Sequence, residues 1–208
     1  MKQAEYERLK QRIAFDQQYG PLVCGMDEVG RGPLAGPVVA ACVLMPQDEM
    51  SWIEGVKDSK KIAEKKREQL ALRIQEKALA YGIGLADEAE IETHNILGAT
   101  KIAMRRAYQA MNRPEAFVLI DALDPIFLPA RGKGIIKGDG QSYAIAAASI
   151  LAKVTRDAMM RALDVQYPVY GFARNKGYGT KEHREAILQH GVCPSHRMSF
   201  LQGILHGK

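Results

Sequence analysis

Acidic residues stand beside glycines and an arginine in one short stretch near the N-terminus of this sequence. Asp27 and Glu28 close a short apolar run, and Gly30-Arg31-Gly32 follows them almost directly. A pair of carboxylates loses hydration on burial unless a cation or a hydrogen-bond donor faces it. Glycine allows another backbone to come close and allows positive φ. We therefore hypothesise that a divalent metal and a phosphate backbone meet here; the competing interpretation is a solvated turn shaped by glycines.

Two further acids also follow predicted strands. Asp121 ends the apolar run 116–120, and Asp139 comes shortly after the run 135–137. In open α/β sheets, ligands gather at the carboxyl ends of the strands. Carboxylates without a cluster of histidine or cysteine favour a hard cation, Mg²⁺ or Mn²⁺. Two such ions can activate a water and stabilise the leaving oxygen of a phosphodiester.

The histidines do not suggest a metal-free route to the same chemistry. Cleavage of a phosphodiester next to a 2′-hydroxyl without metal typically uses a histidine acid–base pair. Only His196, beside Arg197, has a neighbour that suggests function. We expect the other histidines to be surface or capping residues: His94, His183, His190 and His206.

Strands and helices that alternate along the chain are expected to position the acids. We predict strands at 22–26, 37–44, 83–86, 116–121 and 135–137, the first two forming a hairpin. We predict helices at 4–18, 62–79, 96–111, 142–163, 181–190 and 196–205, with a helical turn at 87–92 and loops at 45–56 and 174–180. This pattern indicates an α/β protein, a mixed sheet flanked by helices. We expect one domain over 1–208, with a leading helix over about 1–20 and a helical C-terminal segment over about 165–208.

Composition favours a polyanionic partner. The formal net charge is +5, and from Leu151 onward nine basic residues face four acidic ones. The three cysteines show neither metal-binding nor disulfide spacing, which is typical of reduced thiols in the cytoplasm. The start of the chain has no apolar signal region and no run approaches membrane-spanning length, so we expect a soluble cytoplasmic protein without a membrane partner.

An ordered series of motifs makes the strongest signal. The stretch 25–39 is followed by Asp58-Ser59-Lys60, Asn95-Ile96, Asp121, Lys137-Gly138-Asp139, 146–157, Tyr170-Gly171-Phe172, 175–180 and 196–200. The series, over roughly residues 22–201, resembles the type 2 ribonucleases H, the bacterial ribonuclease HII family.

This resemblance implies a fold, an activity and a set of acids. The fold is a ribonuclease-H-like mixed sheet with flanking helices and a helical C-terminal segment. The activity is endonucleolytic cleavage of RNA in RNA–DNA hybrids and on the 5′ side of single ribonucleotides embedded in duplex DNA. The catalytic and metal-binding residues are Asp27, Glu28, Asp121 and Asp139. They would bind two divalent ions, Mg²⁺ or Mn²⁺, and position the attacking water, giving 3′-hydroxyl and 5′-phosphate products; Asp139 is the ligand expected to bind only with substrate present.

The resemblance also implies residues that read and hold the nucleic acid. The Gly30-Arg31-Gly32 turn resembles the family's reader of the 2′-hydroxyl, the group that separates RNA from DNA. Arg31 is expected to pair with a phosphate or with a nearby acid. Tyr178 resembles the tyrosine that stacks near the ribonucleotide. We expect phosphate contacts from Lys60, Ser149, Lys153, Lys176, Thr180 and Arg197. For each of them the alternative is a solvated charge or a helix cap. Lys153 and Arg156 could instead neutralise the acids.

Departures from the family pattern are small, and two other functions stay open. Gly179 stands where many members have proline, which alters loop stiffness more than chemistry. Arg31 argues against the type 3 sister group, which has threonine there and an N-terminal DNA-binding domain that we do not expect in this chain. The alternatives are a noncatalytic nucleic-acid-binding module and a nuclease of the same superfold that acts on DNA alone, such as a resolvase. We expect a monomer, with a sliding clamp as a candidate partner.

Overall fold

A mixed sheet forms the centre of the molecule in a computed structural model that describes residues 3–48 and 62–206. The strand order is β3-β2-β1-β4-β5. Strand β1 pairs antiparallel with β2 and parallel with β4, and β4 pairs parallel with β5. The strands are β1 (Val23–Val29), β2 (Val38–Leu44), β3 (Ala80–Ala86), β4 (Phe117–Asp121) and β5 (Gly132–Ile135). The predicted α/β class and the β1–β2 hairpin are confirmed.

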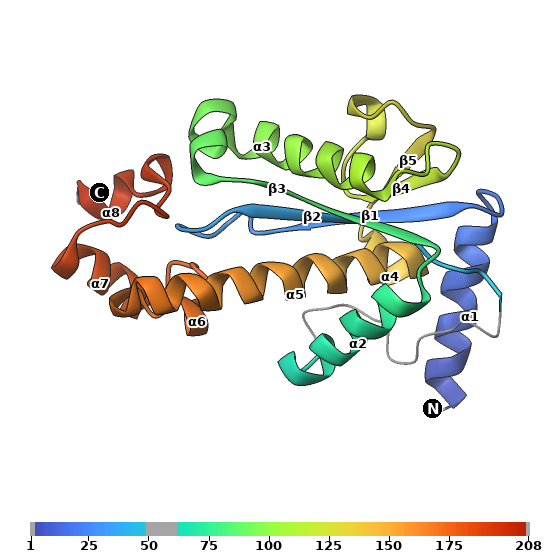
Figure 1. The fold of residues 1–208 in the computed structure, drawn as a ribbon, viewed down its shortest axis with the longest axis horizontal. Helices are drawn as coiled ribbons and strands as arrows, with labels where there is room; N and C mark the ends of the chain where they lie inside the picture. The colour runs from blue at the N-terminus through green and yellow to red at the C-terminus, as the bar shows by residue number, and fades with distance from the viewer. Residues whose placement is uncertain (1–2, 49–61, 207–208) are drawn as a thin grey trace.

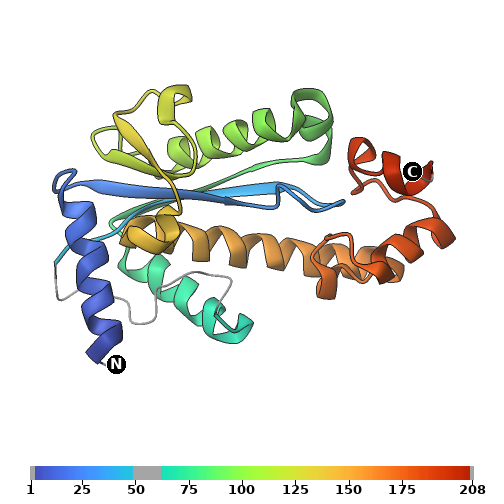
Figure 2. The same cartoon turned by 180° about the vertical axis from the view of Figure 1, so that it is seen from behind.

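Helices cover both faces of this sheet (Figures 1 and 2). Helix α3 lies on one face, and the long α5 lies on the other with α2 beside it. The C-terminal helices gather at the far end of α5, next to the turn of the β1–β2 hairpin. The helices are α1 (Gln3–Gln17), α2 (Glu64–Lys77), α3 (Glu88–Met111), α4 (Gly138–Gln141), α5 (Tyr143–Gln166), α6 (Phe172–Asn175), α7 (Lys181–His190) and α8 (Gln202–Leu205), with short 3₁₀ turns η3 (Pro125–Phe127), η4 (Pro168–Tyr170) and η5 (Met198–Phe200).

Helix α5 packs close to β1 through a row of small residues. Residues 144, 146, 147, 148 and 152 are alanines that are at most 1% exposed. Gly25 of β1 faces the start of this helix, and a Cβ there would lie 2.0 Å from the backbone carbon of Ala144. Only glycine allows this approach. The close packing sets the distance between the acid-bearing strand β1 and the side chains of α5.

Several boundaries differ from the predictions for identifiable reasons. Strand β1 continues to Val29 because its pairing with β2 extends to the Val29–Val39 pair, so Asp27 and Glu28 lie within the strand rather than after it. Strand β5 ends at Ile135, where its pairing with Asp121 ends, and Lys137 takes a left-handed φ of 55°.

Two helical predictions also change. Residues 88–111 form one helix with a kink at Asn95, whose φ is 57°. The final helical piece is split into η5 and α8, and the predicted loop 174–180 overlaps α6. Lys60 and most of the predicted loop 45–56 lie outside the described residues.

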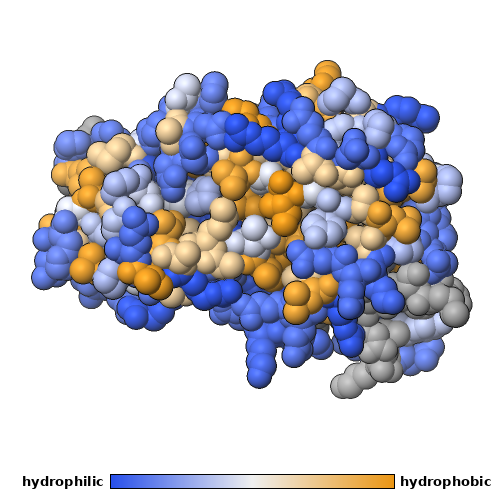
Figure 3. Space-filling model, viewed as in Figure 1, coloured by the Kyte–Doolittle hydropathy of each residue, from blue (hydrophilic) through white to orange (hydrophobic). Residues whose placement is uncertain are grey.

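The surface in Figure 3 is mainly hydrophilic, with apolar residues in a band over the edge strand β3. Tyr81 and Leu85 of that strand are 39% and 36% exposed. Among the described residues, no helix combines the length and the apolar character needed to cross a lipid bilayer.

Candidate active site

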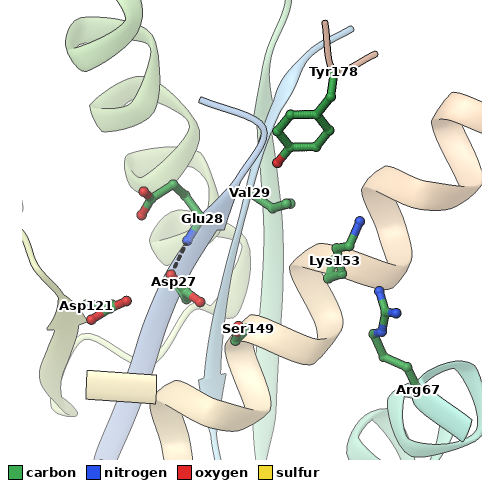
Figure 4. A pocket seen from close by; sticks show the side chains of 8 residues that line it. All are labelled: Asp27, Glu28, Val29, Arg67, Asp121, Ser149, Lys153 and Tyr178. Carbon is green, nitrogen blue, oxygen red and sulfur yellow. Dashed lines mark hydrogen bonds between the residues drawn. The ribbon is translucent and has the colours of Figure 1, made fainter. Parts of the chain in front are cut away.

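Parallel pairing of β1 with β4 brings the first and third predicted acids together. Met26 is the register partner of Ile120, so Asp27 and Asp121 are the next residues on neighbouring strands. Both line a cavity of about 360 Å³, shown in Figure 4, with Glu28, Val29, Arg67, Ser149, Lys153 and Tyr178. Residues 94 positions apart in the sequence thus line the same cavity, as expected for acids at the ends of neighbouring strands.

Asp27 is the most buried carboxylate of the cavity. The residue is 7% exposed, its Oδ1 accepts a 2.8 Å hydrogen bond from the Glu28 amide, and its side chain also hydrogen-bonds Ser149 of α5. Burial raises the pKa of Asp27 well above its usual value, and the charges of Glu28 and Asp121 raise it further. The fold therefore holds this group where a positive charge would stabilise its ionised form.

Glu28 and Asp121 already have partners from the chain. Arg31 Nη1 lies 3.4 Å from Glu28 Oε1, so the arginine pairs with the nearby acid, one of its two predicted roles. Burial still raises the pKa of Glu28, although the Arg31 charge opposes this. Asp121 Oδ1 accepts a 2.7 Å hydrogen bond from the Gly138 amide, which ties β4 to the start of α4.

The carboxylates of the cavity suit a hard divalent cation, although their oxygens do not converge on one point in this structure. Three carboxylates face one partly enclosed cavity, and their oxygens are the ligands that Mg²⁺ and Mn²⁺ prefer. Within residues 3–48 and 62–206, no three acidic, histidine or cysteine side chains converge closely enough to hold a metal as they stand. Glu28 would have to leave Arg31 to join a ligand set. Asp139 lies in α4, one residue after the Asp121 partner Gly138, and does not line the cavity.

A cationic wall faces these acids. Lys153 Nζ donates to Asp157 Oδ1 one turn further along α5, and Arg67 Nη1 donates to Asp157 Oδ2 at 3.2 Å. Burial lowers the pKa of Lys153, whereas the contact with Asp157 opposes this. Lys153 therefore pairs with Asp157 rather than neutralising the carboxylates. Sequence reasoning missed Arg67, because nothing in its local sequence indicates that α2 packs against α5.

Tyr178 stands at the mouth of the cavity, next to the loop 30–36. Tyr178 lines the cavity, and the residue is 44% exposed, which leaves surface for stacking. A Cβ on Gly32 would lie 3.9 Å from Tyr178 Cε1, so the ring and the glycine turn are neighbours. The Leu34 amide donates to the Gly177 carbonyl at 2.8 Å, which fixes the loop to the segment that carries Tyr178.

The other predicted phosphate ligands are engaged within the protein. Arg197 and Arg156 are 0% exposed and donate to backbone carbonyls, so the prediction of a phosphate contact does not fit Arg197, and neutralisation of the acids does not fit Arg156. Lys176 Nζ lies 3.2 Å from Glu64 Oε1. Thr180 caps α7 by accepting from the His183 amide, its alternative role.

Two histidines are buried behind Tyr178. The Cys193 amide donates to His196 Nδ1 at 2.9 Å, His196 Nε2 lies 3.1 Å from His183 Nε2, and His183 Nδ1 lies 3.0 Å from the Tyr178 carbonyl oxygen. Because His196 Nδ1 accepts, its Nε2 carries the proton and donates to His183, whose Nδ1 then donates to Tyr178. The prediction that His183 is a surface or capping residue is therefore wrong; the fold buries it and uses it to hold the Tyr178 segment.

Comparisons with known proteins agree with this arrangement. The sequence model of the family described as Ribonuclease HII matches residues 24–202. The chain belongs to the ribonuclease HII family. Ribonuclease HII of Acetivibrio thermocellus is 50% identical over 195 residues, 94% of this chain and 75% of that protein. Ribonuclease HII of Clostridioides difficile is 52% identical over 206 residues, 97% of this chain and 80% of that protein.

Solved structures support the same fold. The ribonuclease H2 of Pyrococcus horikoshii aligns with a TM-score of 0.70 at 25% identity, over 89% of this chain and 97% of that one. A ribonuclease HII of Archaeoglobus fulgidus, solved in complex with PCNA, aligns with a TM-score of 0.71 at 24% identity, over 85% of this chain and 92% of that one. As a member of the ribonuclease HII family, this chain is a metal-dependent endoribonuclease, a hydrolase of the ribonuclease H type.

Proposed function

We propose that the protein hydrolyses the RNA strand of RNA–DNA hybrids and nicks duplex DNA on the 5′ side of a single embedded ribonucleotide. The observation that carries this proposal is the convergence of two features in one cavity. Asp27, Glu28 and Asp121 form its acidic side, and Tyr178, beside the glycine turn, stands at its mouth. Hydrolysis and recognition of a ribose would then occur within one nucleotide of each other.

The acids would hold the metal ions. We assign Asp27, Glu28 and Asp121 as ligands, with Asp139 joining them when substrate is bound. Bound divalent ions would supply the activation of the attacking water and the charge that stabilises the leaving oxygen, giving 3′-hydroxyl and 5′-phosphate ends. Carboxylate oxygens select Mg²⁺ or Mn²⁺ without choosing between them.

The protein's own side chains would orient these ligands. Ser149 holds one side of Asp27 through a hydrogen bond, and the Gly138 amide holds Asp121. Arg31, which is 43% exposed at its side chain, is free to swing from Glu28 to a substrate phosphate once a metal binds Glu28. The arginine would then exchange one anionic partner for another.

Recognition of the nucleic acid would use the turn and the ring. The backbone at Gly30-Arg31-Gly32 would contact the 2′-hydroxyl, and Tyr178 would stack on the adjacent nucleotide. Ser149, Lys153, Lys176 and Thr180 would lie along the phosphate backbone, after exchange of Lys153 and Lys176 from their acidic partners. We assign Lys60 to the same set from sequence alone.

Cleavage of three labelled duplexes tests the proposal: an RNA–DNA hybrid, a DNA duplex with one ribonucleotide, and the same duplex entirely of DNA. We expect cutting of the first two with Mg²⁺ or Mn²⁺, none of the third, and loss of all cutting with EDTA or with Asp121→Asn. Glu76→Gln, an exposed carboxylate on α2, is the matched control that should retain activity.

Other outcomes would point to the alternatives. Binding of the hybrid without cleavage would indicate a noncatalytic module, and cutting of the all-DNA duplex would indicate a DNA nuclease. Full activity of Asp121→Asn would remove that residue from the proposed ligand set.

A substrate of this kind suggests a role in the removal of ribonucleotides from DNA. We propose a monomer that acts in ribonucleotide removal from DNA in the cytoplasm, with the segment 165–208 of its single domain as a nucleic-acid-binding region. A sliding clamp is a candidate partner, because the Archaeoglobus fulgidus neighbour was solved in complex with PCNA. Co-elution of this protein with its host's clamp in gel filtration tests that assignment, and separate elution would contradict it.

A further inference from the structure

Two buried arginines lie behind the glycine turn without a carboxylate partner among the described residues. Arg156 and Arg197 are both 0% exposed, and within the described chain their guanidinium groups donate to backbone carbonyls. Burial lowers the pKa of Arg197 to about 10, with the Arg156 charge as the second cause, so it remains charged at neutral pH. A buried charge must be stabilised by hydrogen bonds. For Arg197 the carbonyls of the loop 30–36 provide them, and for Arg156 the carbonyls of Ala35, Pro37 and Lys176 do.

Arg197 gathers the carbonyls of the loop around one guanidinium. Its Nη2 donates to the Gly30 carbonyl at 2.7 Å, and its Nη1 donates to the Arg31 and Pro33 carbonyls at 3.1 and 2.9 Å. Its Nε donates to the Gly36 carbonyl at 2.9 Å. A planar fork of five N–H donors can satisfy acceptors on several sides, which a lysine cannot do.

The direction of these carbonyls fixes the direction of the next amides. The described chain has no cis peptide bond, and in a trans peptide the C=O and the following N–H point in opposite directions. With the Gly30 and Arg31 carbonyls turned toward Arg197, the amides of Arg31 and Gly32 point away from it. Within the described chain these two amides donate to no acceptor. They form a pair of adjacent donors beside Tyr178.

We propose that Arg197 is a positioning residue for ribonucleotide recognition: by binding the Gly30 and Arg31 carbonyls, it directs the amides of Arg31 and Gly32 toward the 2′-hydroxyl of the substrate. The proposal rests on the proposed function. Preorganised donors bind an acceptor without the cost of ordering a loop. Arg197 thereby sets the preference for ribose over deoxyribose although it never touches the substrate.

Arg156 offers a matched control. It is equally buried, lies against the same loop, and donates to the Ala35, Pro37 and Lys176 carbonyls, but not to those of Gly30 and Arg31. Arg197→Lys and Arg156→Lys both keep the charge and lose the fork. We expect comparable losses of Tm, since both variants break several buried hydrogen bonds.

The deciding measurement is the preference for ribose. In an Asp121→Asn background, which blocks cleavage, the Kd is measured for a duplex with one ribonucleotide and for the same duplex in DNA alone. Arg197→Lys should reduce the ratio of the two Kd values about tenfold, whereas Arg156→Lys should keep it. An unchanged ratio for Arg197→Lys, or equal losses for both variants, would overturn the proposal.

A measurement without the Arg197 variant covers the case in which it does not fold. In ¹⁵N-labelled Asp121→Asn protein, the amide signals of Arg31 and Gly32 should shift with the ribonucleotide duplex and not with the all-DNA duplex. Equal shifts with both duplexes would overturn the proposal. Absence of any ribose preference or cleavage in the unmodified enzyme would instead contradict the proposed function itself, so the two failures are distinguishable.

Discussion

Replacement of Asp27 by asparagine should make the metal-free protein more stable while removing its activity. Asp27 is 7% exposed, and burial raises its pKa well above the usual value, with the charges of Glu28 and Asp121 adding to the shift. Because the folded-state pKa is raised, the free energy of unfolding is highest below the unfolded-state pKa of the group, where it is protonated in both states, and it falls as pH rises through the raised folded-state pKa. The asparagine of Asp27→Asn would carry no charge, and its Oδ1 could still accept from the Glu28 amide.

The expected magnitude follows from the burial of the charge. A buried polar group without adequate partners costs about 1–3 kcal/mol, and a charged group costs more, so removal of the Asp27 charge should give a gain of at least about 1 kcal/mol. For a domain of this size, that gain raises Tm by about 2–4 °C per kcal/mol. The gain should be largest at pH 8 and should shrink as pH falls toward 4.

Thermal unfolding at pH 8 in EDTA, with and without added Mg²⁺ or Mn²⁺, tests this reasoning. The metal should raise the Tm of the unmodified protein by binding the folded state, and should raise that of Asp27→Asn much less. Glu76→Gln controls for the loss of one surface carboxylate and should move Tm by less than about 1 °C. A Tm of Asp27→Asn at or below that of the unmodified protein in EDTA would refute the electrostatic argument.

Three further expectations follow from the packing around the cavity. Gly25→Ala should destabilise the fold by about 3 kcal/mol or more in urea unfolding, since the new methyl would lie 2.0 Å from the α5 backbone. Gly203→Ala, whose new methyl would have no atom within 4 Å, is the control. Equal stabilities of the two variants would contradict the role of close packing at Gly25. His196 should remain neutral until pH approaches about 4, because burial and the neighbouring His183 lower its pKa to about 4. The stability due to the neutral ring is present above pH 6.5 and lost as pH falls toward 4; an NMR midpoint near 6.5 would show that the ring is solvated. Tyr178→Phe should reduce cleavage at a single ribonucleotide about tenfold more than it reduces cleavage of a long hybrid. A tenfold difference corresponds to about 1.4 kcal/mol, the contribution of one hydrogen bond from the lost hydroxyl. Equal losses on both substrates would indicate a packing role for Tyr178.

Local patterns in the sequence determined the elements and the nature of the chemistry. The apolar run of β2 is 0% exposed throughout, and β4 ends in Asp121 as predicted. Residue type alone indicated oxygen ligands and a hard cation. The ordered motifs indicated the family, because each motif carries its information in consecutive residues.

Tertiary structure decided which side chains meet and what each charge does. The β1–β4 register, rather than any local signal, places Asp27 beside Asp121. Arg197 follows a histidine in a basic part of the chain, where a surface cation would be expected, yet 161 residues separate it from Gly36, whose carbonyl it binds. Sequence shows the charge of an arginine, whereas its burial and its partners depend on contacts between distant segments. For that reason the acids of the site could be predicted from the sequence, whereas the buried guanidinium behind the glycine turn became visible only in the folded chain.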